Sequence, residues 1–236
     1  MKEIISGENI DFVQENENFL DEFAKGSKYK VAKLDLGVSL NSTKAELVGI
    51  ALRVISRRLT SEGANVVNFI WRKFRNFQFF RLAISVQFEQ TLVAFPDGAE
   101  DKMKCYIEKT IEIANKLKNP SNLCVFIASN SEEVRFYLKN ELSNRGICVD
   151  SISKEVIVEG FGLKNPTWQL LHQIRQLLEF TLATRMDGLI YNQQSAIGHL
   201  TALTIGTTTG IKPIYLLEKS TDDLCKFEIY DKNQDK

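Results

Sequence analysis

The stretch Leu123–Val134 reads LCVFIASNSEEV and contains the clearest strand-to-helix transition in the chain. Residues 123–128 form an apolar run without alternation, which is typical of a strand covered on both faces of a parallel sheet. The next three side chains, at 129–131, are good helix caps, and Glu132 and Glu133 follow in the first turn, where they suit the helix dipole. A covered strand followed directly by a capped helix predicts an α/β fold.

The same alternation continues on both sides of this stretch. Further strands are predicted at 82–88, 147–149, 189–191 and 214–217, and helices at 99–117, 131–146, 168–186 and 196–205. Strands that alternate with helices of this length predict a parallel sheet with right-handed crossovers. The fold class is therefore α/β, a Rossmann-like parallel sheet with helices on both faces.

Two parts of the chain are distinguished. Residues 1–80 are predicted to form a short N-terminal α/β portion, with strands at 29–36 and 65–70 and a helix opened by Ser42. Residues 81–236 form the Rossmann-like domain, in which 151–166 is irregular. The basic and aromatic segment 71–81 has phenylalanines at helical spacing, which favours a helix packing inward over a surface for single-stranded nucleic acid.

Bulk composition excludes several classes of protein. Lys+Arg and Asp+Glu number 30 each, so net charge favours neither nucleic acid nor membrane as a partner. No apolar run approaches the roughly 18 residues of a spanning helix, and the N-terminus does not read as a secretory signal. The four cysteines form no C-x-x-C pair, so we expect reduced thiols in a cytoplasmic protein, with neither a disulfide framework nor a zinc site.

Polar side chains follow three of the predicted strands, and the carboxyl ends of parallel strands share one edge of a sheet, where such folds bind ligands. The first strand continues into Ser85–Gln90. Backbone donors at a helix start suit a pyrophosphate, and side-chain amides suit sugar hydroxyls or a base edge. Helix capping alone is the alternative at each position. The candidate ligand-binding residues are Ser129, Asn130, Ser131, Asn192, Gln193, Gln194, Ser195 and Gly198.

Two segments suggest a family. VFIASNSEEV (Val125–Val134) and LLEFTLATRMDGLIYNQQSAIG (Leu177–Gly198) resemble, in this order, parts of the donor-binding half of GDP-fucose-dependent fucosyltransferases of the α1,6 and protein-O type. The resemblance extends from about Leu82 to Leu217. It implies a GT-B type transferase that binds a nucleotide sugar and moves the sugar to an acceptor hydroxyl by an inverting displacement. It implies no metal and no other cofactor.

The chain departs from this family at the catalytic motif. Where the family has a His-x-Arg-Arg-x-x-Asp type motif, Ser85–Gln90 reads SVQFEQ and contains no cation, and the family's Asp-Asp pair appears as Asn130-Ser131. A leaving diphosphate needs positive charge, and an acceptor hydroxyl needs a base. The best-placed candidates are Arg81 as the cation and Glu89 as the base.

Two other readings stay open. The first is a catalytically silent relative that works by binding a partner. The second is a nucleotide- or NAD-processing domain of TIR-like or deoxyribosyltransferase-like type, for which Glu89, Glu132 or Glu133 would be the catalytic carboxylate. The sequence leaves open the acceptor, glycan or protein, and the possibility of a homo-oligomer.

Overall fold

The structure is a computed structural model that describes residues 59–76, 78–88, 99–206, 213–217 and 225–229. The predicted strand at 29–36 and the helix from Ser42 lie outside these residues, and so does Glu89.

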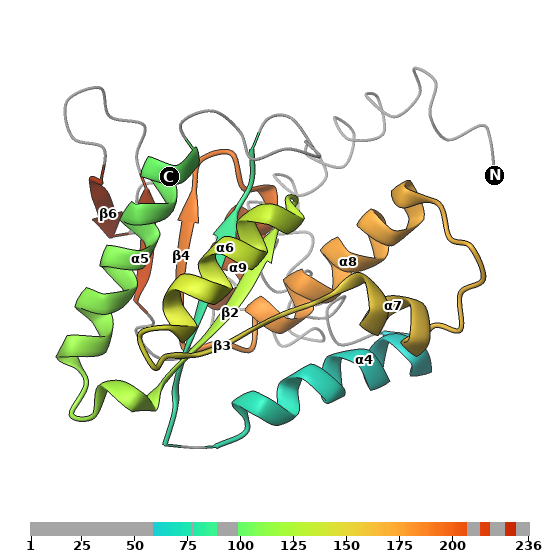
Figure 1. Ribbon diagram of the computed structural model, residues 1–236, viewed down its shortest axis with the longest axis horizontal. Coiled ribbons are helices and arrows are strands. Elements are labelled where there is room, and N and C mark those ends of the chain that lie inside the picture. Colours follow the sequence, from blue (N-terminus) through green and yellow to red (C-terminus); the bar gives the residue numbers. More distant parts are fainter. Residues whose placement is uncertain (1–58, 77, 89–98, 207–212, 218–224, 230–236) are drawn as a thin grey trace, which may run out of the picture.

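A mixed sheet of six strands forms the centre of the described part, in the order β3-β2-β1-β4-β5-β6 (Figure 1). The first five strands of that order are parallel, and β6 joins the edge antiparallel to β5. The α/β, Rossmann-like prediction is thus confirmed, while β6 was not predicted. The strands are β1 (Phe80–Val86), β2 (Leu123–Ser129), β3 (Cys148–Ser151), β4 (Gly188–Asn192), β5 (Ile214–Leu217) and β6 (Phe227–Ile229).

Helices cover both faces of the sheet, as expected (Figure 1). Alternate residues of β1 point to opposite faces: Leu82 and Ile84 pack in one core cluster with α5 and α6, and Ala83 packs in the other with α4, α7, α8 and α9. Every residue of β2 is buried, which explains its unbroken apolar sequence. The helices are α4 (Ser61–Trp71), α5 (Ala99–Lys116), α6 (Glu132–Ser143), α7 (Lys154–Gly160), α8 (Trp168–Ala183) and α9 (Ala196–Gly206).

Three local predictions were wrong. Residues 65–70, predicted as a strand, belong to α4, because Val66, Val67 and Ile70 lie at helical spacing and bury one face of it against the sheet. The predicted helix over 71–81 ends early: a 3₁₀ turn, η2 (Arg72–Phe74), follows α4, and β1 begins at Phe80. The irregular stretch 151–166 contains α7, capped by Ser153.

The cysteine prediction was also wrong. Cys124 and Cys148 face each other on neighbouring strands β2 and β3 and form one disulfide, and Cys105 of α5 pairs with Cys225 in the other. Cys124 and Cys148 are 24 residues apart in sequence, and Cys105 and Cys225 are 120 apart, so no local spacing pattern predicts either pairing. The expected cytoplasmic location stays a prediction. The argument for it from reduced thiols no longer holds, because disulfides are typical of oxidising compartments.

Among the helices that the structure describes, none has both the length and the apolar character that crossing a bilayer requires.

Candidate functional site

The carboxyl edge of the sheet brings the three predicted strand ends together. β1 lies between β2 and β4, and Ser85 is in register with Ala128 on one side and Tyr191 on the other. The strand order reverses between β1 and β4, which is the position where open α/β sheets form a ligand crevice. The predicted residues therefore lie on one edge, but most of them bind one another.

Two asparagines hold the end of β1. Asn192 accepts a hydrogen bond from the Gln87 N–H (3.2 Å) and donates to the Gln87 carbonyl (2.8 Å). Asn130 does the same with the N–H and carbonyl of Phe88, at 3.2 and 2.9 Å. Each side-chain amide thus pairs with the backbone of β1's continuation as a neighbouring strand would. They fix the chain as it leaves β1 and are already hydrogen-bonded.

Ser195 and Gly198 position α9. The Ser195 hydroxyl is fully buried, accepts from the Gly198 N–H (2.9 Å) and lies 2.7 Å from the Ser85 hydroxyl. A Cβ added at Gly198 would lie 2.5 Å from the Cβ of Tyr191, so only glycine lets α9 approach β4 this closely. Both residues therefore have structural roles.

We expect Gly198→Ala to lower the free energy of unfolding by about 1–3 kcal/mol, because the new methyl group overlaps Tyr191. Gly63→Ala in α4 is the matched control: its Cβ would meet Leu59 at an ordinary 3.5 Å, so it should be neutral or stabilising by up to about 1 kcal/mol. Urea denaturation measures both variants. Equal effects would refute the close packing of α9 on β4.

The two serines before α6 are also bound internally. Ser131 is the N-cap of α6: its hydroxyl accepts from the Val134 N–H and donates to Glu133, at 3.4 and 3.0 Å. The Ser129 hydroxyl accepts from the Ser131 N–H at 3.2 Å. The predicted capping role of this segment is confirmed.

Gln193 and Gln194 are the more accessible members of the set. Gln193 is exposed, and its carbonyl lies 3.0 Å from Nε2 of His199. Gln194 is half-buried and accepts a hydrogen bond from Asn192 at 3.2 Å. These two amides are the predicted residues best able to meet a ligand.

A buried ionic cluster at the carboxyl end of β2 was not predicted. Arg135 of α6 donates to the Ser129 carbonyl and places Nη2 2.8 Å from Oε1 of Glu132. Arg175 of α8 places Nη2 2.6 Å from the same oxygen. The two guanidinium groups come from helices on opposite faces of the sheet and share the carboxylate of Glu132. We call Arg135 and Arg175 the arginine pair.

The fourth member of the cluster is Glu179 of α8, which is 1% exposed and lies 3.6 Å from Arg135. Burial raises the pKa of Glu179 to about 7, against the opposing effects of Arg135 and Arg175. Burial, and then the positive charge of the same two arginines, lowers the pKa of His172. Burial thus favours the neutral form of Glu179, which offsets less of the positive charge of the arginine pair than a carboxylate does.

Exposure differs sharply within the cluster. The side chains of Arg135 and Arg175 are 3% and 10% exposed, whereas that of Glu132 is 56% exposed. Glu132 is thus a carboxylate at the surface, bound to two buried cations. An external anion that displaced it would find hydrogen-bond donors already in place.

A hollow of about 790 Å³ opens beside Glu132, between α5 and α6. Its lining includes the rings of Phe136 and Tyr137, and the Phe136 ring is 68% exposed. The remaining lining residues are Glu100, Glu133, Asn140 and Glu141. The hollow is acidic, so it suits groups that donate hydrogen bonds, while the arginine pair beside it suits an anion.

The structure does not place Arg81 near this edge. Arg81 lies at the amino end of β1, about 16 Å from its carboxyl end at Val86, given about 3.3 Å per residue. Its guanidinium binds Asp187 through two contacts of 2.6 and 2.9 Å. It is therefore unavailable to a ligand at the carboxyl edge. Glu89, the predicted base, lies outside the described residues.

The sequence contains part of the information needed to predict the ionic cluster of Glu132, Arg135, Arg175 and Glu179. Glu132 and Arg135 are three residues apart, and Arg175 and Glu179 four apart, which are spacings of neighbours on one helix. Nothing in the sequence indicates that the two pairs meet over the end of β2, because that contact depends on the packing of α6 and α8.

The chain was compared with protein families, curated sequences and solved structures. No protein-family model and no curated protein sequence matches the chain. A structure of NodZ α-1,6-fucosyltransferase soaked with GDP-fucose aligns with a TM-score of 0.46 and 16% identity over 74% of this chain and 49% of NodZ. Fucosyltransferase NodZ from Bradyrhizobium aligns at 0.45 and 14%, over 73% and 48%. The chain spans about half the length of these structures, and the function is therefore inferred from its own residues.

Proposed function

We propose that this chain binds a nucleoside diphosphate sugar at the carboxyl edge of its sheet and transfers the sugar to an acceptor hydroxyl. The observation that supports this most is the arginine pair, in which Arg135 and Arg175 converge on Glu132 within 2.8 and 2.6 Å. The segment Ser85–Gln90 contains no cation, and these two arginines could supply the missing positive charge. A diphosphate carries more charge and more acceptor oxygens than the carboxylate it would displace.

Space for the rest of the ligand is available next to the pair. In this proposal the diphosphate displaces Glu132, and the base and sugar enter the hollow between α5 and α6. The exposed Phe136 ring offers a surface on which a base can stack. The carboxylates of Glu100 and Glu141 accept hydrogen bonds from amino and hydroxyl groups.

The chemistry proposed is a single displacement. The acceptor oxygen forms a bond to the anomeric carbon, while the bond between that carbon and the phosphate oxygen breaks and its electron pair leaves with the diphosphate. The arginine pair stabilises the charge that builds on this leaving group. The proton of the acceptor hydroxyl goes to a base, for which Glu89, next in sequence to the anchored Phe88, is our candidate.

The resemblance of residues 125–134 and 177–198 to fucosyltransferases makes GDP-fucose the first donor to test. Thermal-shift measurements should include GDP-fucose, GDP, UDP-sugars, NAD and ATP. A rise with GDP and GDP-fucose, together with release of fucose from the donor, is the expected result. A rise with NAD alone would instead support a nucleotide-processing domain. No rise with any compound would support a protein that acts through a partner.

We expect Glu89→Gln to lower the rate of sugar release from GDP-fucose by about 100-fold or more, with little change in GDP binding, because the amide cannot accept the proton. Glu108→Gln, at an exposed position of α5, should leave the rate unchanged. Release of free fucose, followed by chromatography, provides the measurement. An undiminished rate in the Glu89 variant would exclude this residue as the base.

A further inference from the structure

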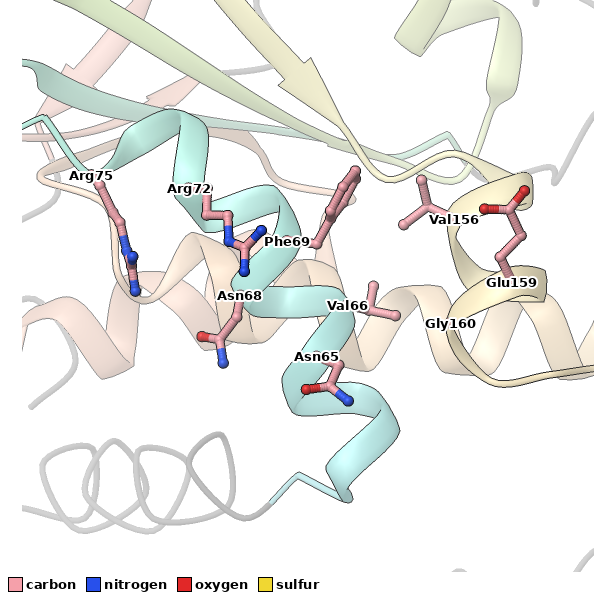
Figure 2. Close-up of a pocket in the computed structure, with 9 residues that line it drawn as sticks. All are labelled: Asn65, Val66, Asn68, Phe69, Arg72, Arg75, Val156, Glu159 and Gly160. Carbon is pink, nitrogen blue, oxygen red and sulfur yellow. The ribbon is translucent and has the colours of Figure 1, made fainter.

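A second pocket is lined by residues of other helices than the hollow beside Glu132. It has a volume of about 570 Å³ and lies between α4 with its η2 extension and α7 (Figure 2). This is within the usual size range of small-ligand sites, roughly 300–1,000 Å³. We call it the α4–α7 groove. Its lining is Asn65, Val66, Asn68, Phe69, Arg72, Arg75, Val156, Glu159 and Gly160.

The floor of the groove is a close contact between two helices. A Cβ added at Gly160 of α7 would lie 2.2 Å from a methyl group of Val66 of α4, so the helices touch there. Val66 is buried, while the polar lining residues of α4 are exposed on its outer face. The groove therefore has a packed apolar floor and a polar wall.

The polar wall combines cations, amides and a ring. Asn65, Asn68 and Arg72 recur at intervals of three and four residues, which places them along one side of α4 (Figure 2). Arg75 extends this row. The Phe69 ring projects from a different side of α4, toward Val156 of α7, and the residue is 54% exposed. Phe69 thus adds an exposed aromatic surface to a groove whose positive charge comes from Arg72 and Arg75.

The charge on this wall is not neutralised by neighbours in the part of the chain that the structure describes. Lys73, between the two arginines in sequence, binds Asp150 at 2.7 Å. Within the described residues, Arg72 and Arg75 form no such ion pair. Among the described residues that line the groove, Glu159 is the one carboxylate, and it lies on the opposite wall. These lining residues thus carry two positive charges and one negative charge.

We propose that the α4–α7 groove binds a nucleoside monophosphate, with the phosphate on Arg72 and Arg75 and the base stacked on Phe69. Planar guanidinium groups match phosphate oxygens, and aromatic rings stack on any base. The amides of Asn65 and Asn68 provide donors and acceptors for the base edge, and Glu159 accepts from ribose hydroxyls. The same chemistry is found in one nucleotide unit of a single strand, so the test must separate the two sources.

The test is isothermal titration calorimetry of AMP, GMP and UMP, with inorganic phosphate, ribose 5-phosphate and an eight-nucleotide single strand alongside. At least one nucleotide should bind the wild-type protein. The double variant R72Q/R75Q and the variant F69A should each bind it at least tenfold more weakly. All three replaced side chains are exposed, so these variants should keep the wild-type melting temperature.

A control variant separates this site from general effects of charge. R145Q/K118Q removes two exposed positive charges elsewhere and should bind the nucleotide as the wild type does. R72Q/R75Q and F69A leave the residues of the arginine pair unchanged, so the loss of binding that they cause is independent of the proposed donor site. Four outcomes would overturn the inference: no binding of any nucleotide to the wild type, undiminished binding in R72Q/R75Q, binding of ribose 5-phosphate as tight as that of nucleotides, or binding of the single strand alone.

Discussion

Replacing Arg135 with methionine is expected to lower the free energy of unfolding by about 3–5 kcal/mol at pH 8, which is the usual cost of removing one partner from a buried ion pair. The change leaves the Ser129 carbonyl without its guanidinium donor and removes a positive charge 3.6 Å from the buried Glu179. Urea denaturation measures the loss.

The matched control is Arg145→Met. Arg145 follows the same helix and binds Glu141 at 2.7 Å, but its side chain is 42% exposed. Exposed pairs contribute about 1 kcal/mol or less, so this variant should lose no more than that. Similar losses in the two variants would contradict the burial of the ionic cluster.

The loss in Arg135→Met should also depend on pH. Burial raises the pKa of Glu179 from 4.5 to about 7, so the folded state holds this proton more tightly than the unfolded state does. The contribution of Glu179 to the free energy of unfolding therefore falls as pH rises from about 4.5 to 7, and is constant above that range. At pH 5 the carboxyl group is neutral and depends less on Arg135. The penalty of the variant should then be smaller at pH 5 than at pH 8.

Two substitutions in the arginine pair should change GDP binding in opposite directions. Arg175→Gln is expected to lower the affinity about 10- to 100-fold, because a charge-assisted hydrogen bond to phosphate contributes about 1.5–3 kcal/mol. Glu132→Gln is expected to raise it about tenfold, because the neutral amide competes less well for the two guanidinium groups. Calorimetric titration of GDP at pH 7.5 gives both values.

Glu133→Gln is the control for the second substitution, since Glu133 is adjacent but binds Ser131 rather than an arginine. It should change GDP affinity less than Glu132→Gln does. Equal gains in both variants would mean that general negative charge at the start of α6, and not a specific competitor, limits binding.

The sheet could be predicted from sequence because its signals are local. The apolar run of β2 and the caps of α6 and α8 reflect burial and capping at the positions themselves, and the predicted bounds of β1 to β5 were right to within two residues. The prediction of a strand at 65–70 was wrong because Val66, Val67 and Ile70 favour strands locally, whereas packing against the sheet stabilises a helix there. α4, which the sequence assigned to an N-terminal portion, shares its core with the sheet.

The sequence placed the predicted site residues on one edge of the sheet, but it did not reveal how they bond with one another. The three strand ends do share one edge, as parallel strands require. The polar residues there satisfy one another, as in the double hydrogen bonds of Asn130 and Asn192 to the end of β1. The charges that could bind a diphosphate come instead from the sides of α6 and α8, and their meeting is a long-range packing result that no short motif encodes.

The described carboxylates near this edge bear on the nucleotide-processing alternative. Glu132 is bound to two arginines, and Glu133 accepts from Ser131 at 3.0 Å. A nucleotide-processing enzyme of that type requires a carboxylate that is free to react, and neither residue is placed in that way.

A crystal structure of the protein soaked with GDP tests the proposed donor site most directly. We predict that the diphosphate oxygens lie about 2.7–2.9 Å from the guanidinium groups of Arg135 and Arg175, with Glu132 turned away from both. Density for GDP elsewhere, with Glu132 still bound to the two arginines, would contradict the proposal.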